Sequence, residues 1–339
     1  VYEVSSLELG SENNDSVQEE SRRSGVEEHQ TRTYMSMACI RNGEARYAIK
    51  RLNAAVLADE DLIVPGIADL ALEAKFLSVL QHPNIIKMRA LASGDLCSDG
   101  FFIILDRLYD TLDMAISKWR IEQKKYAGVM CCMADSEKSE ELFHDRLHFA
   151  WDLATAMEHV HNSNVIYRDL KPDNIGFDVR GDIKIFDFGL AKELKDPDEN
   201  GAYNLTGFCG SPMFMAPEVI RKEPYNLSAD VYSFSILFWQ MMSLETPYVK
   251  LSRDSLLRLV SQKHYRPAYD DNWPDKLVRL LKRCWHYDPK KRPTFSDVAR
   301  SMNEITMDLG AEGEDLGASL DVSTRSFQDL MSKAKKAKK

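Results

Sequence analysis

Several features that mark particular classes of protein are scarce in this sequence of 339 residues. Basic residues are not in excess: 44 Lys and Arg stand against 53 Asp and Glu, giving a formal net charge of −9. This balance argues against binding nucleic acid through its phosphates. The densest apolar stretch, residues 235–244 (SILFWQMMSL), is too short to cross a bilayer. No basic segment followed by an apolar one opens the sequence, so we expect neither a secretory signal nor a membrane span.

Cysteine is also sparse, and its spacing is not that of a disulfide framework or a zinc site. The six cysteines form no CxxC pair, and only Cys131 and Cys132 adjoin. In a chain of this length such scattered thiols indicate a reducing compartment. We expect a cytoplasmic protein, with the basic C-terminal end (KAKKAKK) allowing a nuclear location.

Apolar residues are few at both ends of the chain. Residues 1–33 are rich in Ser and Glu, and such a segment buries too little surface to offset its ordering entropy, which predicts a flexible segment. Residues 307–339 mix Gly, acidic residues and Ser before the basic end, which predicts a disordered tail. The charged stretch 118–140 is interpreted as an inserted loop.

Between the ends, the hydrophobic pattern changes from strand-like to helical. The first half shows strand-like runs, a hairpin signal at Asn42-Gly43 and one helical segment, whereas the second half is mostly helical. This order predicts a small sheet lobe and a larger helical lobe, with a cleft between them that suits a ligand. The predicted strands are 34–40, 46–52 and 101–105, and the predicted helices are 69–80, 142–161, 228–244 and 273–285.

Four short motifs stand in one order along this chain. They are Tyr-Ala-Ile-Lys at 47–50, Tyr-Arg-Asp-Leu-Lys-Pro-Asp-Asn at 167–174, Asp-Phe-Gly at 187–189 and Ala-Pro-Glu at 216–218. Each motif alone is weak, but together they resemble the protein kinase superfamily over about residues 34–302. The lysine two residues after Asp169 is typical of serine/threonine kinases, while the stretches DVYSF and GSPMFMAPE resemble those of tyrosine-kinase-like kinases.

The resemblance implies a two-lobed α+β kinase fold. The kinase domain is expected over residues 34–306, with a small antiparallel N-lobe of one main helix at about 34–105. A larger, mostly helical C-lobe is expected at about 109–306. Residues 1–33 would then replace or precede the glycine-rich loop of the family.

The resemblance also implies roles for the residues of the catalytic loop. Asp169 would accept the proton of the substrate hydroxyl, and Lys171 would sit beside the transferred phosphate. Asn174 and Asp187 would hold Mg²⁺, which prefers hard oxygen ligands. Alone, an Asp and an Asn on a loop are more often turn-forming residues, and only the joint motif reverses that interpretation.

A second set of residues would bind the nucleotide. By resemblance, Lys50 would contact the α- and β-phosphates of ATP and pair with Glu73 on the helix that follows. Leu105 would stand at the back of the adenine pocket, and Ala48 would pack above the ring. The backbone from Asp106 to Leu108 would face the adenine edge.

Two further positions match structural residues of the family. Asp230 is expected to anchor the catalytic loop from a central helix, and Arg292 is expected to pair with Glu218. Neither is counted as a site residue.

The activation segment, residues 187–218, carries hydroxyl groups that could be modified. Thr206 is the candidate for an activating phosphate that pairs with Arg168, supplied by an upstream kinase. Ser211 is the rival hydroxyl, but by resemblance it contacts Asp169 and Lys171, so its modification would block activity.

The sequence departs from the family in two places. Tyr167 replaces the usual His of the catalytic loop, and no G-x-G-x-x-G loop precedes Lys50. The expected function is transfer of the γ-phosphoryl group of ATP, with Mg²⁺, to a protein Ser or Thr. The alternative is a pseudokinase that serves as a binding or scaffolding module, because the glycine-rich loop is missing.

Overall fold

The computed structural model describes residues 2–3, 40–41, 44–92, 101–128, 135–199 and 201–314. The chain forms two compact units, which we describe separately. The first comprises Val1–Ser78 and Ile86–Arg107, and the second Val79–Ile85 and Leu108–Lys339. A small antiparallel sheet in the first unit and a helical second unit confirm the predicted α+β class.

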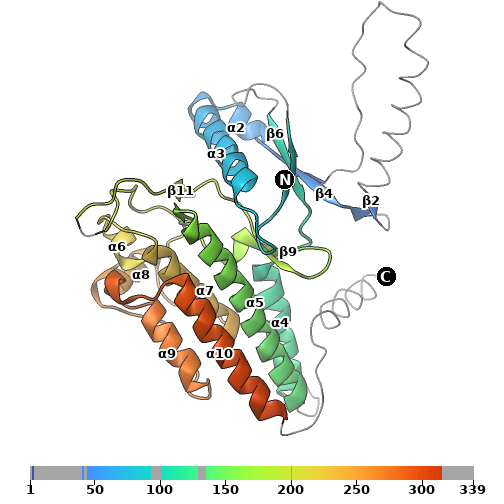
Figure 1. The fold of residues 1–339 in the computed structure, drawn as a ribbon, viewed down its shortest axis with the longest axis vertical. Coiled ribbons are helices and arrows are strands. Elements are labelled where there is room, and N and C mark those ends of the chain that lie inside the picture. Colours follow the sequence, from blue (N-terminus) through green and yellow to red (C-terminus); the bar gives the residue numbers. More distant parts are fainter. Residues whose placement is uncertain are drawn as a thin grey trace, which may run out of the picture. The chain divides into compact units, whose positions relative to one another are not determined.

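The first unit is built on a four-stranded antiparallel sheet (Figure 1). Its order is β1 (Tyr2–Glu3), β4 (Tyr47–Arg51), β6 (Phe102–Asp106) and β5 (Met88–Leu91). A separate hairpin joins β2 (Ile40–Arg41) to β3 (Glu44–Ala45), and the helices are α2 (Ala54–Leu57) and α3 (Glu60–Val79). The sheet and α3 hold the side chains that the sequence assigned to the nucleotide.

Strand β1 corrects one expectation about the N-terminal segment. Tyr2 pairs with Ile49 and Glu3 with Ala48, so these two residues belong to the sheet. The prediction that residues 1–33 form one flexible segment is wrong at this point, because a two-residue strand has no hydrophobic pattern to reveal it. Residues 4–39 lie outside the described residues, and they follow β1 in chain order.

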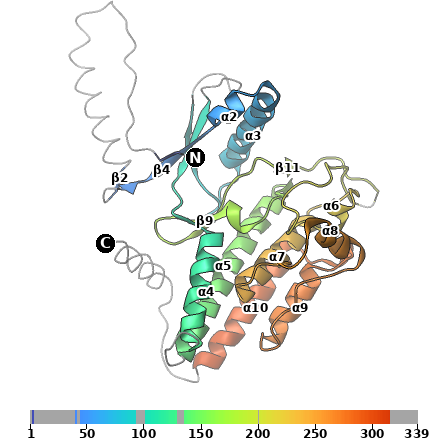
Figure 2. The ribbon, with the colours of Figure 1, turned by 180° about the vertical axis from the view of Figure 1, so that it is seen from behind.

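The second unit is mostly helical. Its long helix α5 (Ser136–Asn162) packs against α4 (Leu112–Tyr126), α7 (Ser228–Ser243) and α10 (Phe295–Glu314), and the same group is visible from behind (Figure 2). Nearly every residue of α7 is buried, which explains its apolar sequence. The remaining helices are α6 (Pro217–Ile220), α8 (Arg253–Gln262) and α9 (Asp275–Cys284).

Short strands of the second unit frame the catalytic loop. One antiparallel sheet has the order β10 (Ile183–Ile185), β9 (Ile175–Phe177), β7 (Asp110–Thr111). A second pairs β8 (Val165–Ile166) with β11 (Lys192–Glu193). Within the described part of this unit there are also two 3₁₀ turns, Pro172–Asn174 and Pro289–Lys291.

Two expectations about polar stretches are wrong. The charged stretch 118–140 is largely helical, because α4 continues to Tyr126 and α5 begins at Ser136, where Asp135 caps it. The charges lie on exposed faces and hide the helical pattern. At the C-terminal side α10 continues to Glu314, so residues 307–314 are not a disordered tail, and residues 315–339 lie outside the described residues. No helix in the described ranges is both long and apolar enough to cross a membrane.

Candidate active site

The β9–β10 hairpin brings two of the predicted metal ligands to one end. Ile175 pairs with Ile185, so Asn174, just before β9, stands beside the end of β10, and Asp187 follows two residues later. The amide N–H of Phe186 donates to the carbonyl of Asn174 at 3.0 Å. Asp187 adopts φ +66°, a left-handed conformation that is uncommon for a non-glycine residue. The strand pairing therefore brings the backbone of Asn174 and that of Asp187 to the same end of the hairpin.

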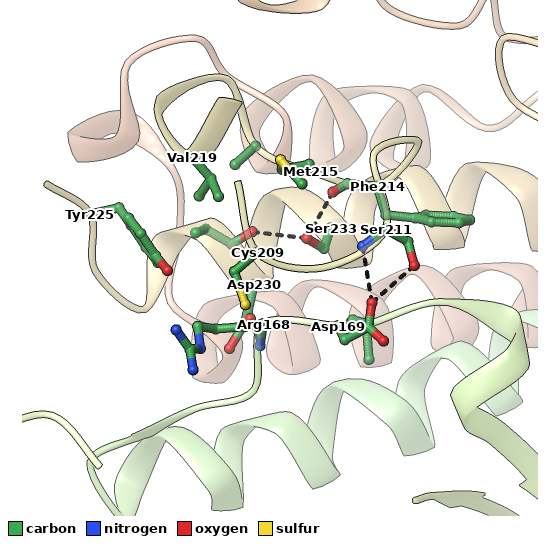
Figure 3. A pocket seen from close by; sticks show the side chains of 13 residues that line it. Arg168, Asp169, Cys209, Ser211, Phe214, Met215, Val219, Tyr225, Asp230 and Ser233 are labelled. Atoms are coloured by element: carbon green, nitrogen blue, oxygen red, sulfur yellow. Dashed lines mark hydrogen bonds between the residues drawn. The ribbon is translucent and has the colours of Figure 1, made fainter. Parts of the chain in front are cut away.

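The carboxylate of Asp169 is held from three directions. Lys171 Nζ and Asn174 Nδ2 donate to its Oδ2 at 2.7 and 2.8 Å. The backbone N–H and the hydroxyl of Ser211 both donate to its Oδ1 at 3.0 Å (Figure 3). Asn174 Nδ2 also reaches the Asp169 carbonyl at 2.9 Å. Three residues that the sequence assigned to the site, together with Ser211, are thus in direct contact.

The catalytic loop is anchored from beneath by Asp230 at the start of α7. This buried carboxylate accepts the backbone N–H groups of Tyr167 and Arg168, each at 2.8 Å. His161 Nε2 lies 2.9 Å from the same carboxylate. The expected anchor is therefore present, and it supports the left-handed conformation of Arg168, whose φ is +72°.

Tyr167 fills the place where the family usually has His. Its hydroxyl donates to the carbonyl of Phe186 at 2.5 Å, and its ring meets Phe188 edge-on with centroids 5.1 Å apart. Both rings are fully buried. The tyrosine therefore ties the catalytic loop to the Asp-Phe-Gly segment through a hydrogen bond and an aromatic contact.

A glycine lets the activation segment approach the catalytic loop. Gly210 has φ +96°, and a Cβ at this position would lie 2.3 Å from the carbonyl oxygen of Arg168. Any side chain would therefore push the segment away. Gly210 directly precedes Ser211, so this close approach places the Ser211 donors on Asp169, one of the two contacts expected from the resemblance.

Arg168 makes one hydrogen bond to the activation segment. Its Nε donates to the Leu190 carbonyl at 2.6 Å. Its Nη1 is buried and has no hydrogen-bond partner among the described residues. Thr206 is exposed, and its carbonyl accepts the Tyr225 hydroxyl at 2.9 Å. Within the described ranges, no hydrogen bond joins the Thr206 side chain to Arg168.

Four of the residues expected to bind the nucleotide form two pairs in the first unit. Lys50 Nζ lies 2.5 Å from Glu73 Oε2, and Glu73 is buried on α3. Ala48 pairs with Leu105 across β4 and β6, and both are buried. The side chain of Asp106 is occupied by a two-pronged pair with Arg89, at 2.6 and 2.8 Å, and its backbone N–H donates to the Lys87 carbonyl at 3.0 Å.

Leu108 is the first residue of the second unit and packs against the β9–β10 hairpin. A Cβ on Gly176 would lie 2.8 Å from Leu108 Cδ1 and 3.0 Å from the Asp110 carbonyl oxygen, so a larger residue there would force the Leu108 side chain to shift. The next residue, Tyr109, donates its N–H to the Phe177 carbonyl at 2.9 Å. The start of the second unit is thus tied to the strand that follows the catalytic loop.

The Ala-Pro-Glu motif contributes a structural ion pair. Arg292 Nη1 and Nη2 donate to the two carboxylate oxygens of Glu218 at 2.6 and 2.9 Å, and the pair is buried. Arg292 also reaches the carbonyls of His286 and Ser228. The expected pair is therefore present, and it lies in the framework around the site.

Two contacting residues were not singled out by the sequence. His161 meets Asp230 across 69 positions of the chain, and Tyr225 meets Thr206 across 19. Neither residue lies in a motif with a fixed spacing to its partner. Only the fold brings them to the catalytic loop and the activation segment.

Comparison with known proteins agrees with the resemblance to protein kinases. The family model described as the protein kinase domain matches residues 33–302. A probable serine/threonine-protein kinase of Dictyostelium discoideum is 31% identical over 249 residues, which cover 73% of this chain and 24% of that protein. The chain belongs to the protein kinase family, and its similarity is to the serine/threonine type.

Two further relatives show the same pattern. Serine/threonine-protein kinase STY17 of Arabidopsis thaliana is 28% identical over 290 residues, covering 84% of this chain and 46% of that protein. The dual specificity protein kinase shkB of Dictyostelium discoideum is 39% identical over 182 residues, which cover 52% of this chain and 26% of that protein. The chain thus spans from about a quarter to about half the length of these relatives.

Proposed function

We propose that this chain transfers the γ-phosphoryl group of ATP to the hydroxyl of a protein Ser or Thr. The observation that carries the proposal is the Asp169 carboxylate, fixed by Lys171, Asn174 and Ser211 at hydrogen-bond distance. Phosphoryl transfer asks a protein mainly for positioning and for neutralisation of charge. A carboxylate held in this way is suited to orient an incoming hydroxyl and to accept its proton.

The residues next to Asp169 suit the negative charge of a phosphoryl group that is being transferred. Lys171 brings a cation to within 2.7 Å of the carboxylate and would also neutralise a phosphoryl group placed there. The Ser211 hydroxyl now occupies Asp169 Oδ1, the kind of contact that a substrate hydroxyl would make. Substrate binding would therefore replace or share one existing hydrogen bond.

The donor set also fits a magnesium ion. Both hydrogen bonds of Asn174 Nδ2 go to Asp169, so its amide oxygen is the atom left to act as a ligand. Asp187 adds a carboxylate at the same end of the hairpin, and amide and carboxylate oxygens are hard ligands that suit Mg²⁺. When bound, ATP supplies the phosphoryl group, and Mg²⁺ neutralises charge on its phosphates.

The first unit would hold the nucleotide. Glu73 orients Lys50 through their ion pair, so that the ammonium group is positioned for the α- and β-phosphates. Ala48 and Leu105 supply buried apolar surface on neighbouring strands for the adenine ring.

The alternative of a binding module rested on the missing glycine-rich loop. In the kinase pattern that loop joins the first two strands, and the lysine stands on the third. No G-x-G-x-x-G stands before Lys50, which favours the alternative. The complete set of Lys50, Asp169, Asn174 and Asp187 favours phosphoryl transfer, and we give it the greater weight.

A transfer assay tests the proposal. The purified protein is incubated with γ-labelled ATP, Mg²⁺ and a mixture of peptides that contain Ser, Thr and Tyr, and the labelled amino acids are identified. We expect label on Ser and Thr and none when Mg²⁺ is chelated. Absence of labelled Ser and Thr in the presence of Mg²⁺ would overturn the proposal.

The same site has a proposed regulator, phosphorylation of Thr206 by an upstream kinase. Thr206 is exposed, and the buried Nη1 of Arg168 lacks a partner within the described ranges. A phosphate brings nearly two negative charges and several acceptor oxygens, which pair well with a guanidinium. We expect fully active protein to carry this phosphate and Thr206→Ala to lower turnover. Mass spectrometry that finds Thr206 unmodified at full turnover would exclude this regulation.

A further inference from the structure

Tyr225 joins the activation segment to the rest of the second unit through three hydrogen bonds. Its backbone exchanges two bonds with Tyr203, at 2.9 and 3.2 Å. Its hydroxyl donates to the Thr206 carbonyl at 2.9 Å. Tyr225 itself is only 3% exposed, and its hydroxyl bond to the exposed Thr206 is part-buried. One buried residue therefore fixes both ends of the stretch from Tyr203 to Thr206.

The same tyrosine lies beside Arg168. Both residues line the pocket between the catalytic loop and the activation segment (Figure 3). Burial raises the pKa of the Tyr225 hydroxyl, and the nearby Arg168 guanidinium only partly opposes this. The hydroxyl is therefore protonated at neutral pH and remains a donor to the Thr206 carbonyl. Arg168 in turn holds the Leu190 carbonyl at 2.6 Å, near the start of the activation segment.

A short length of chain links Tyr225 to the catalytic carboxylate. Phe208, two residues after Thr206, donates its N–H to the Val219 carbonyl at 3.0 Å. Gly210 then passes under the Arg168 carbonyl, and Ser211 gives two hydrogen bonds to Asp169. Since Ser211 fixes Asp169 Oδ1, any shift of the stretch from Thr206 to Gly210 changes how that carboxylate is held.

We propose that Tyr225 is a positioning residue that holds the activation segment against Arg168 and Asp169 before any phosphate is attached. The inference rests on the proposed phosphoryl transfer, because its consequence is measured as turnover. The hydroxyl supplies, through the Thr206 carbonyl, the anchoring that a phosphate on the Thr206 side chain would add from outside. The unphosphorylated chain then keeps a basal activity that depends on Tyr225.

The two anchors should partly replace each other. Tyr225→Phe keeps the ring and both backbone bonds but removes the hydroxyl that donates to the Thr206 carbonyl and interacts with Arg168. In the dephosphorylated protein we expect kcat to fall about fivefold, the change in population that one lost hydrogen bond typically causes. With phosphate on Thr206, the segment has a second attachment, and the fall should become smaller than twofold.

The experiment compares wild type, Tyr225→Phe and a control, Tyr265→Phe, which removes the hydroxyl of a tyrosine that is 47% exposed. Each protein is treated with phosphatase, and half is then rephosphorylated. Peptide turnover gives kcat and KM, and hydrogen exchange is followed at the amides of Tyr203 and Phe208. We expect Tyr225→Phe alone to lose kcat and to exchange faster at these amides, with phosphorylation restoring both.

Two results would overturn the inference. One is a dephosphorylated Tyr225→Phe protein with the kcat and the exchange rates of wild type. The other is an equal loss in both phosphorylation states, which indicates a general structural effect. If wild type itself transfers no phosphate, the proposed function fails, while faster exchange at Tyr203 and Phe208 still decides whether Tyr225 holds the segment.

Discussion

Two clusters of charged side chains in the second unit use similar bonds but differ in access. The Glu218–Arg292 pair has side chains that are 2% and 0% exposed, with N–O distances of 2.6 and 2.9 Å. In the Asp169–Lys171 pair the side chains are 10% and 23% exposed at 2.7 Å. The first pair is closed to solvent, whereas the second can be reached by another molecule.

The difference separates a structural role from a chemical one. Arg292 uses its remaining donors on the carbonyls of His286 and Ser228, so the closed cluster joins distant parts of the chain and has no group to spare. In the open cluster a neighbour of Asp169, the Ser211 hydroxyl, is itself the chemical type of the proposed substrate. Charged groups that can exchange partners suit a reaction, and those that cannot suit stability.

The largest effect is expected at Asp187, next to the open cluster. Asp187→Ala removes the carboxylate proposed to hold Mg²⁺, so phosphoryl transfer should fall to background while the unfolding midpoint changes little. Turnover and thermal unfolding of the same preparation check both parts. Wild-type turnover in Mg²⁺-ATP would show that the metal-site assignment is wrong.

The closed cluster should respond in the opposite way. Arg292→Leu leaves the Glu218 carboxylate buried without its partner, which typically costs about 3–5 kcal/mol of unfolding free energy. Denaturant unfolding measures the change, and any protein that remains folded at low temperature should still transfer phosphate. A variant as stable as wild type would refute the structural role of this pair.

A smaller effect is expected from Tyr167→Phe. The change keeps the ring contact with Phe188 but leaves the part-buried Phe186 carbonyl without this donor, at a cost of about 1 kcal/mol. Because this bond ties the catalytic loop to the Asp-Phe-Gly segment, we expect a modest loss of both the free energy of unfolding and turnover. If only the free energy of unfolding falls, the hydroxyl of Tyr167 has a structural role alone. If only turnover falls, it serves the reaction alone.

No effect on catalysis is expected from the basic C-terminal end. Deleting Lys333–Lys339 removes five lysines of a basic run that lies outside the described residues and carries no proposed site residue. Turnover on a short peptide substrate should therefore match wild type. A large loss of turnover would place this end in the catalytic machinery.

The sequence predicted the site better than its surroundings. Asp169, Lys171 and Asn174 lie within six positions, so their spacing on one loop largely determines that they meet. The Glu218–Arg292 pair spans 74 positions and came only from the family resemblance. Tyr225 and His161 could not be predicted, because their contacts depend on how distant helices and loops pack.

The sequence patterns did not predict three elements, α4, the start of α5 and β1, for a different reason. Helix α4 and the start of α5 carry many charges on exposed faces, so their composition imitates a loop. Strand β1 has two residues and is defined by its partner β4, which no local pattern can show. Hydrophobic periodicity finds an element only when one of its faces is buried over several residues.

The most direct test of this account is Asp169→Asn, which keeps the shape of the side chain and removes its negative charge. We predict that phosphoryl transfer falls by about 10²–10⁴-fold, the usual contribution of a general base. Binding of Mg²⁺-ATP and the unfolding midpoint should stay close to those of wild type. Turnover equal to wild type in the folded variant would contradict the claim that the open cluster around Asp169 carries the reaction.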